Sequence, residues 1–185
     1  QYLSPFFTAF IAGFLLGEKT RWAQWGFFIL SFAGIVIVKD SSAQIPADLV
    51  LLGVVSSVFS GLAYNAIRKL KNEAPLVVVM YFPLVATPVM IGFSFFNWIT
   101  PVGMEWLLLI AVGILTQFAQ VYMTKAYQSS EVNTVAPLKY IGVIFALTWD
   151  ILLFDFVPNG TMFLGIAMVI GGVLMNLQYK ARLAK

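Results

Sequence analysis

The chain has 185 residues, of which 61% are hydrophobic and only 10% are charged, and its formal net charge is +3. Because an ordinary soluble domain carries about 25% charged residues, this balance argues against a soluble protein and indicates a membrane protein. Cysteine and histidine are both absent, which removes disulfides, thiolate metal ligands and the commonest general base.

Seven apolar segments follow one another with short connections between them. Each approaches the roughly 20 residues that an α-helix needs to cross a hydrocarbon core about 30 Å thick. Short connections require successive helices to alternate in direction. We therefore expect an all-α, polytopic transmembrane helix bundle, with helices at about 2–16, 22–38, 47–67, 75–98, 103–124, 132–154 and 160–178.

The first two segments are apolar on every face, as expected for helices surrounded by lipid or by other helices. A polar connector of only five residues, 17–21, joins them. Such a short connector permits only an antiparallel pair, so the sequence predicts a transmembrane hairpin. Its turn contains Lys19 and Arg21 and is expected to stay in the cytoplasm.

The basic residues are distributed unevenly between the two predicted faces of the membrane. Nine of the eleven lysines and arginines fall on one side, Lys39 falls on the other, and Lys139 lies inside a predicted helix. The positive-inside rule then predicts a multi-pass protein with a cytoplasmic C-terminus. The expected location is the inner (plasma) membrane. Because the charges lie at helix ends, they indicate a lipid bilayer rather than nucleic acid as the partner.

The chain also contains a weak internal repeat. A shift of 137 residues lays Leu15–Glu18 over Leu152–Asp155, and the two turns face opposite sides of the membrane. An inverted-topology repeat is typical of secondary transporters. We expect residues 1–40 to be the last two helices of a first repeat, 41–180 a complete five-helix second repeat and 181–185 a cytoplasmic tail. The intact protein would then have ten helices, and this chain alone would be inactive.

Several short motifs along the chain resemble EamA-type transporters of the drug/metabolite transporter superfamily. They are Pro5-x-x-Thr8-Ala9, Leu15-Leu16-Gly17-Glu18-Lys19, Gly61-Leu62-Ala63-Tyr64, Ala126-Tyr127 and Val135-Ala136-Pro137-Leu138-Lys139-Tyr140. The resemblance implies two five-helix inverted repeats around a central cavity, with alternating access driven by exchange or proton coupling. It also implies a small organic metabolite, such as an amino acid, as substrate. Gly142 and Phe154-Asp155 depart from the family pattern, which leaves the fold but weakens any inference about the substrate.

Lys139 is the sharpest candidate functional residue. If its helix starts near Ser130, Lys139 lies about 13 Å along it, close to the middle of the membrane. A charge there costs roughly 2.5–3.5 kcal/mol on insertion scales, so it usually faces a cavity or a partner. It would attract a carboxylate or phosphate, or exchange a proton. The alternative is a side chain that extends to the cytoplasmic headgroups.

Other polar and aromatic residues are weaker candidates for the cavity. Gln117 and Gln120 belong to the polar face of segment 103–124, and Tyr140 follows Lys139, while Tyr64 and Tyr81 are further candidates. Polar side chains in membrane helices need partners, so these residues either line a substrate path or join neighbouring helices by hydrogen bonds.

Proline and acidic residues are the candidates for kinks and gates. Pro83 and Pro88 should kink segment 75–98 because proline removes backbone donors, and Pro137 lies just before Lys139. Asp150 is expected near the outer interface, either as a gate or as a boundary charge. Glu18 is either a gate residue or the partner of a neighbouring basic residue.

No catalytic residue, metal ligand or cofactor site is predicted, because the sequence lacks the motifs of metal-dependent and covalent enzymes. A small-molecule substrate is the expected partner, and the sequence does not decide whether the protein forms a homodimer. Two alternatives to a transporter remain. A seven-helix receptor or retinal protein would lack the inverted repeat, and a retinal protein would need its lysine in the last helix. A membrane scaffold or assembly subunit would lack a hydrated cavity.

Overall fold

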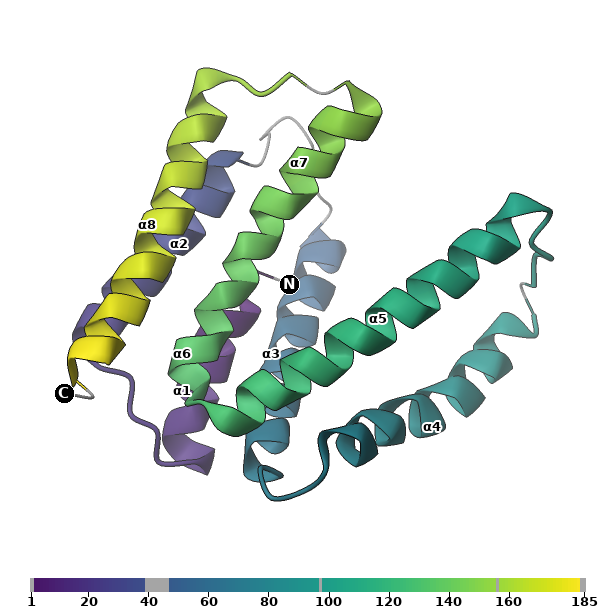
Figure 1. Cartoon of the computed structure of the whole chain (residues 1–185), viewed down its shortest axis with the longest axis horizontal. Helices are drawn as coiled ribbons and strands as arrows, with labels where there is room; N and C mark the ends of the chain where they lie inside the picture. The colour runs from purple at the N-terminus through teal and green to yellow at the C-terminus, as the bar shows by residue number, and fades with distance from the viewer. Residues whose placement is uncertain (1, 39–46, 97, 156, 184–185) are drawn as a thin grey trace. The chain divides into compact units, whose positions relative to one another are not determined.

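The computed structural model describes residues 2–38, 47–96, 98–155 and 157–183, and every regular element within these ranges is a helix. The predicted all-α fold is therefore confirmed, and each of the seven predicted segments contains helix (Figure 1). The helices are α1 (Ser4–Leu15), α2 (Trp22–Val38), α3 (Ala47–Lys69), α4 (Pro75–Ser94), α5 (Met104–Ser129), α6 (Val132–Val135), η1 (Ala136–Ile141), α7 (Gly142–Phe154) and α8 (Gly160–Leu183).

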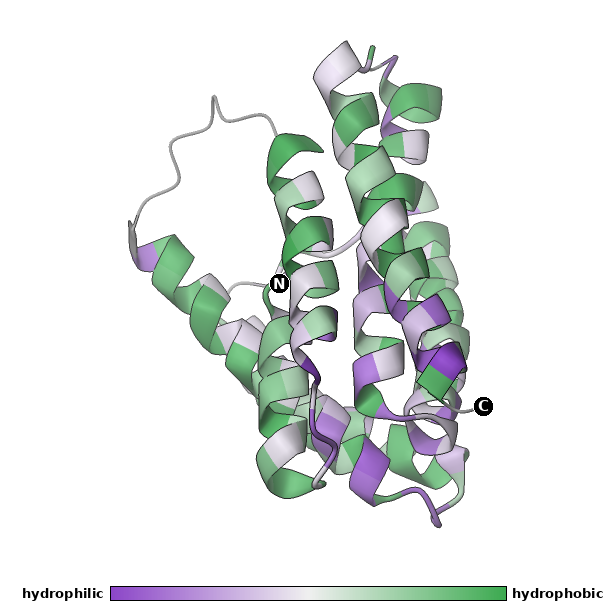
Figure 2. Cartoon of the chain, turned by 90° about the vertical axis from the view of Figure 1, so that its left-hand side faces the viewer, coloured by the Kyte–Doolittle hydropathy of each residue, from purple (hydrophilic) through white to green (hydrophobic). Residues whose placement is uncertain are grey.

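Five of the helical segments are long and apolar enough to cross a membrane. They are Asp48–Lys69, Pro75–Ser94, Met104–Ser129, Val132–Phe154 and Gly160–Leu183. Helices α1 and α2 are apolar but have only 12 and 17 residues, or about 18 and 26 Å at the α-helical rise. Figure 2 shows that hydrophobic residues make up most of the helices, while the most hydrophilic residues gather mainly at helix ends and turns.

The chain forms two compact units. The first comprises residues 1–66 and 130–185, and the second comprises residues 67–129. In the first unit, α2 and α8 lie side by side and run antiparallel (Figure 1). The unit also contains α1, most of α3, and the segment made of α6, η1 and α7.

Glycines allow α2 and α8 to approach closely. A Cβ atom built on Gly34 would lie 2.5 Å from the backbone oxygen of Gly165, and one built on Gly165 would lie 2.7 Å from that of Gly34. Ser31 donates a hydrogen bond to the backbone oxygen of Val169 at 3.4 Å across the same contact. Small residues are typical of close helix pairs in membranes, where van der Waals packing drives association. This contact joins the beginning and the end of the chain.

A hydrophobic cluster extends this contact to η1 and α7. Its buried members come from α2, η1, α7 and α8 and are Ile35, Val38, Tyr140, Val143, Val169 and Val173. The segment that carries Lys139 is therefore packed on one side against the α2–α8 pair.

In the second unit, α4 and α5 form an antiparallel hairpin (Figure 1). At one end of the unit, Arg68 donates a hydrogen bond to the backbone oxygen of Gln128 at 2.6 Å. The Gln128 side chain in turn donates to the backbone oxygens of Leu70 and Glu73 at 2.8 and 3.1 Å. These bonds tie the turn between α3 and α4 to the end of α5.

Candidate functional site

Lys139 lies where one predicted helix changes its geometry. The α-helical hydrogen-bonding pattern stops after Val135, a 3-10 helix runs from Ala136 to Ile141, and α7 then begins at Gly142. Pro137 lies near the start of this 3-10 stretch, where its lack of an N–H group removes one backbone donor. A stretch of 3-10 helix within a longer helix often marks a functional position. Here that position holds the lysine.

Three segments of the first unit converge on the ammonium group of Lys139. Its Nζ donates a hydrogen bond to Ser4 Oγ in α1 at 2.9 Å and another to Tyr64 OH in α3 at 3.2 Å. The same nitrogen lies 5.2 Å from the centroid of the Tyr64 ring, within the range of a cation–π interaction. Ser4 is fully buried, and Lys139 and Tyr64 are half-buried. Two neutral oxygens and an aromatic ring therefore surround the charge.

The charge of Lys139 is not neutralised within the described part of the chain. No aspartate or glutamate in the described ranges forms an ion pair with it. An ammonium has three N–H donors, and the hydroxyl groups of Ser4 and Tyr64 accept two of them. The arrangement holds the ammonium in place without pairing it with a carboxylate of the described residues.

The ammonium is turned away from the connector 17–21. The backbone of Val132 lies beside this connector, because its N–H donates to Glu18 Oε2 at 2.8 Å. Lys139 lies seven residues further along. Its partner Ser4 lies eleven residues before Leu15, at the end of α1 that is about 16 Å from the connector. The Lys139 side chain therefore lies away from the connector, and its position in the middle of the membrane stays a prediction.

Tyr140, next in the chain, points into a different environment. Its side chain is fully buried in the cluster formed with α2, α7 and α8. Its hydroxyl has no hydrogen-bond partner among the described residues. A buried, unpaired polar group is unfavourable, so this hydroxyl does not stabilise the arrangement seen here. That Tyr140 lines a cavity stays a prediction.

Glu18 accepts a hydrogen bond at the start of the segment that carries Lys139. Gly17 ends α1 with a left-handed backbone (φ +68°), which glycine adopts without steric penalty. This turn places the Glu18 carboxylate against the N–H of Val132, the first residue of α6. An acidic group is favoured at such a position because helix N-terminal N–H groups lack partners. In this structure Glu18 positions α6; a gating role stays a prediction.

A network of buried amides surrounds this contact. Asn133 donates to the backbone oxygen of Glu18 at 3.1 Å and accepts from Thr20 Oγ1 at 3.1 Å. Asn176 of α8 donates to the backbone oxygen of Asn133 at 3.0 Å and accepts from Gln24 of α2 at 3.2 Å. Gln24, Asn133 and Asn176 are fully buried. The network joins the connector, α2, α6 and α8.

Several of these residues were not predicted from the sequence. They are Ser4, Thr20, Gln24, Asn133 and Asn176. Gln24 and Asn176 carry a usable signal, because a polar amide inside an apolar segment needs a partner. Ser4, Thr20 and Asn133 lie at segment ends, where polar residues are ordinary, so their sequence positions give no such signal.

The remaining candidates are spread over both units. Gln117 and Tyr81 are exposed and Gln120 is half-buried, all three in the second unit. That they share a cavity with Lys139 stays a prediction. Asp150 is exposed on α7 of the first unit.

The two central prolines of α4 do not end the helix. Pro83 and Pro88 lie inside α4, which continues from Pro75 to Ser94. That they kink α4 stays a prediction. A change from α to 3-10 geometry occurs at η1, close to Pro137.

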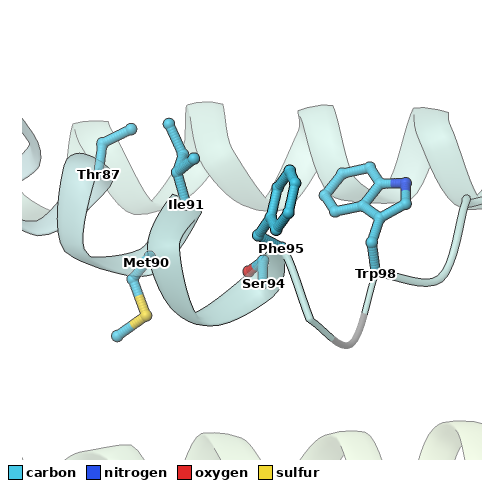
Figure 3. Close-up of a pocket in the computed structure, with 6 residues that line it drawn as sticks. All are labelled: Thr87, Met90, Ile91, Ser94, Phe95 and Trp98. Atoms are coloured by element: carbon cyan, nitrogen blue, oxygen red, sulfur yellow. The ribbon is translucent and has the colours of Figure 1, made fainter.

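An apolar pocket lies along the second half of α4. Its lining residues come from α4 and the residues after it, and Figure 3 shows Ile91, Phe95 and Trp98 on the same side of the helix, while Met90 points the other way. The lining lacks a charged group, and the polar side chains on it are Thr87, Ser94 and the Trp98 indole. This pocket is suited to an apolar chain rather than to a polar solute.

An apolar helical bundle with an ionisable residue at a change of helix geometry is consistent with a membrane transporter. The sequence model of the EamA-like transporter family matches residues 49–178. The chain belongs to this family, whose members are named as transporters rather than enzymes, and its apolar helices make it a multi-pass membrane protein. The resemblance drawn from the sequence motifs is thereby confirmed.

Curated relatives of the chain are named as transporters of small metabolites. The pseudopaline exporter CntI of Pseudomonas aeruginosa is 31% identical over 177 residues, covering 94% of this chain and 60% of the relative. A riboflavin transporter of Vibrio cholerae is 29% identical over 182 residues, covering 97% and 61%. An S-adenosylmethionine uptake transporter of Rickettsia prowazekii is 23% identical over 175 residues, covering 94% and 60%.

The chain thus spans about 60% of the length of these relatives. No solved structure gives a significant match to it. The assignment of residues 1–40 and 41–180 to two repeats stays a prediction.

Proposed function

We propose that the protein carrying this chain is a secondary transporter of a small organic solute in the inner (plasma) membrane. It works by alternating access, with its cavity opening first to one side and then to the other. The observation that carries the proposal is Lys139: a cation inside a membrane segment, at a change in helix geometry, held by neutral groups. An intramembrane ionisable residue without a counter-ion is expensive and is typical of a substrate path.

The names of the relatives support a small organic solute as the substrate, without identifying which one. Their names cite pseudopaline, riboflavin and S-adenosylmethionine, which differ from one another but are all small organic metabolites. Export and uptake both occur among them, so they favour neither direction for this protein. An amino acid or a related solute, moved by exchange or proton coupling, is the working hypothesis.

The test is counterflow in proteoliposomes that contain the full-length protein. Labelled amino acids, organic anions and organic cations are offered in turn, and Lys139→Ala is assayed beside the wild type. We expect uptake of at least one solute and its collapse in the variant. If no solute in the panel is taken up, the proposal fails and a scaffold role is favoured.

Lys125→Ala is the matched control for this experiment. Lys125 also lies over a tyrosine ring, at 5.6 Å from the centroid of Tyr122, but it is exposed and lies in the last five residues of α5. Removing it subtracts the same charge and a similar cation–π contact. Uptake should survive this substitution.

A further inference from the structure

We propose that the ammonium of Lys139 binds a carboxylate group of the transported solute, and that Ser4 and Tyr64 hold the ammonium in position for it. This inference rests on the proposed transporter function and narrows its substrate class. The solute would carry one ionised carboxylate, which forms a charge-assisted hydrogen bond with Lys139.

The first support is the balance of charge. Every other described lysine or arginine lies in a connector or within the last five residues of its helix, which leaves Lys139 as the one deep cation in the described ranges. One positive charge in a medium of low dielectric constant is best neutralised by one negative charge. A carboxylate supplies it. A phosphate group at its second ionisation would leave an excess negative charge, and a cationic group would be repelled.

The second support is the kind of group that holds Lys139. A carboxylate partner from the protein would neutralise the ammonium and compete with an anionic solute. The hydroxyl oxygens of Ser4 and Tyr64 and the Tyr64 ring orient the ammonium without neutralising it. They accept two of its three N–H groups, so donor capacity remains for a solute.

The third support is the position of the ammonium along the segment. Its partner Ser4 lies about 16 Å from the connector end of α1, which is roughly half of a 30 Å hydrocarbon core. With the connector at the membrane surface, a charged group at this depth lies far from the headgroups. Binding an anion there gains more than the same contact at a surface, because the surroundings screen it less.

The experiment separates charge recognition from transport itself. Full-length protein in proteoliposomes is offered N-acetylated alanine, leucine and phenylalanine, each with a radiolabelled acetyl group. Each is supplied as the free acid, as the primary amide, and as the phosphonate analogue, which can carry a second charge. The acid and the amide differ little in size, so their ratio of initial counterflow rates reports recognition of the carboxylate.

We expect the wild type to prefer the acid by about tenfold or more, as a hydrogen bond between charged groups implies. Lys139→Gln should abolish this preference by slowing the acid while leaving the amide. Lys139→Arg should retain the preference because the positive charge remains. Lys125→Gln, the matched control, should leave the ratio of acid to amide unchanged.

Ser4→Ala and Tyr64→Phe provide independent variants if Lys139→Gln does not fold. Each removes one oxygen that orients the ammonium and keeps the charge. We expect a higher KM for the acid, with little change for the amide. A purely structural role would lower the rates of acid and amide together.

Three results would overturn the inference. The first is equal transport of acid and amide by the wild type, and the second is an acid preference that persists in Lys139→Gln. The third is a preference for the phosphonate over the acid. If all the acids fail while another solute shows counterflow, the inference is wrong and the transporter function stands. If no solute shows counterflow, the transporter function fails and this inference fails with it.

Discussion

Lys139 and Tyr140 are adjacent in η1, but their side chains enter different environments. The Lys139 side chain reaches Ser4 and Tyr64, where it finds two hydrogen-bond acceptors. The Tyr140 side chain enters the apolar cluster between α2, α7 and α8, where its hydroxyl has no partner among the described residues. A tyrosine at such a position either contributes to packing through its ring alone or uses its hydroxyl in another conformation of the protein.

Tyr140→Phe distinguishes these two possibilities. Because the buried hydroxyl is unpaired, its removal should leave the free energy of unfolding unchanged or raise it by about 1 kcal/mol. The thermal unfolding midpoint of the full-length protein in detergent measures this change. A clear loss of stability would mean that the hydroxyl has a partner in the folded protein. Loss of transport at unchanged stability would indicate a role in another conformation.

Asn176→Leu should have the opposite effect on stability. The substitution leaves the Gln24 side-chain amide and the backbone oxygen of Asn133 buried without their partner. Leaving buried polar groups unpaired costs about 1–3 kcal/mol. The same unfolding measurement detects the loss. Gln178→Leu is the control, because Gln178 is exposed on the same helix, and an equal effect of both would contradict the assigned network.

At the scale of elements, the Leu15-Leu16-Gly17-Glu18 motif now has a structural explanation. Gly17 allows the left-handed turn that ends α1, and Glu18 then accepts the N–H of Val132 at the start of α6. The two residues act together: one turns the chain, and the other connects the turn to the segment that carries Lys139.

The contact between α2 and α8 provides a prediction at this scale, based on two adjacent glycines. A Cβ atom on Gly172 would lie 2.7 Å from the backbone oxygen of Phe27, whereas one on Gly171 would meet only the end of Met175 at 3.9 Å. Gly172→Ala should therefore destabilise the protein by about 1–3 kcal/mol through overpacking. Gly171→Ala should be neutral or stabilise α8 by up to about 1 kcal/mol, because alanine favours helix.

Thermal unfolding of the two glycine variants in detergent tests this contact. Equal stability of Gly171→Ala and Gly172→Ala would show that α2 and α8 are further apart than described. A larger loss in Gly171→Ala would mean that α8 presents a different face to α2.

For the whole molecule, the distribution of basic residues predicts orientation. Nine of the eleven lysines and arginines lie on the side expected to be cytoplasmic, which predicts that the end of α8 faces the cytoplasm. The chain has no cysteine, so single cysteines introduced into it can report orientation directly. In intact cells, a membrane-impermeant maleimide should label Val157→Cys, between α7 and α8, and spare Arg182→Cys. The reverse pattern would invert the proposed topology.

The helices and their class were accessible from the sequence alone. Hydropathy acts locally: each apolar segment is stabilised by the surrounding bilayer regardless of its neighbours, so runs such as 75–98 and 160–178 indicate helices without knowledge of the fold. The EamA resemblance rests on motifs that are equally local, and the family match confirms it. Lys139 was also recognisable, because an ionisable residue inside an apolar run is conspicuous.

Which residues Lys139, Glu18 and Gln24 contact could be learned only from the tertiary structure. Lys139 and Ser4 are 135 residues apart, Glu18 and Val132 are 114 apart, and Gln24 and Asn176 are 152 apart. The hydropathy and charge of a segment indicate whether it enters the membrane. They do not indicate which faces of two helices meet. That choice follows from packing, as where glycines let α2 approach α8. The sequence by itself determined an apolar helical membrane protein and pointed to a lysine inside an apolar run. Only the tertiary structure decided that neutral hydroxyl groups hold this lysine, because those contacts exist only once distant helices have packed.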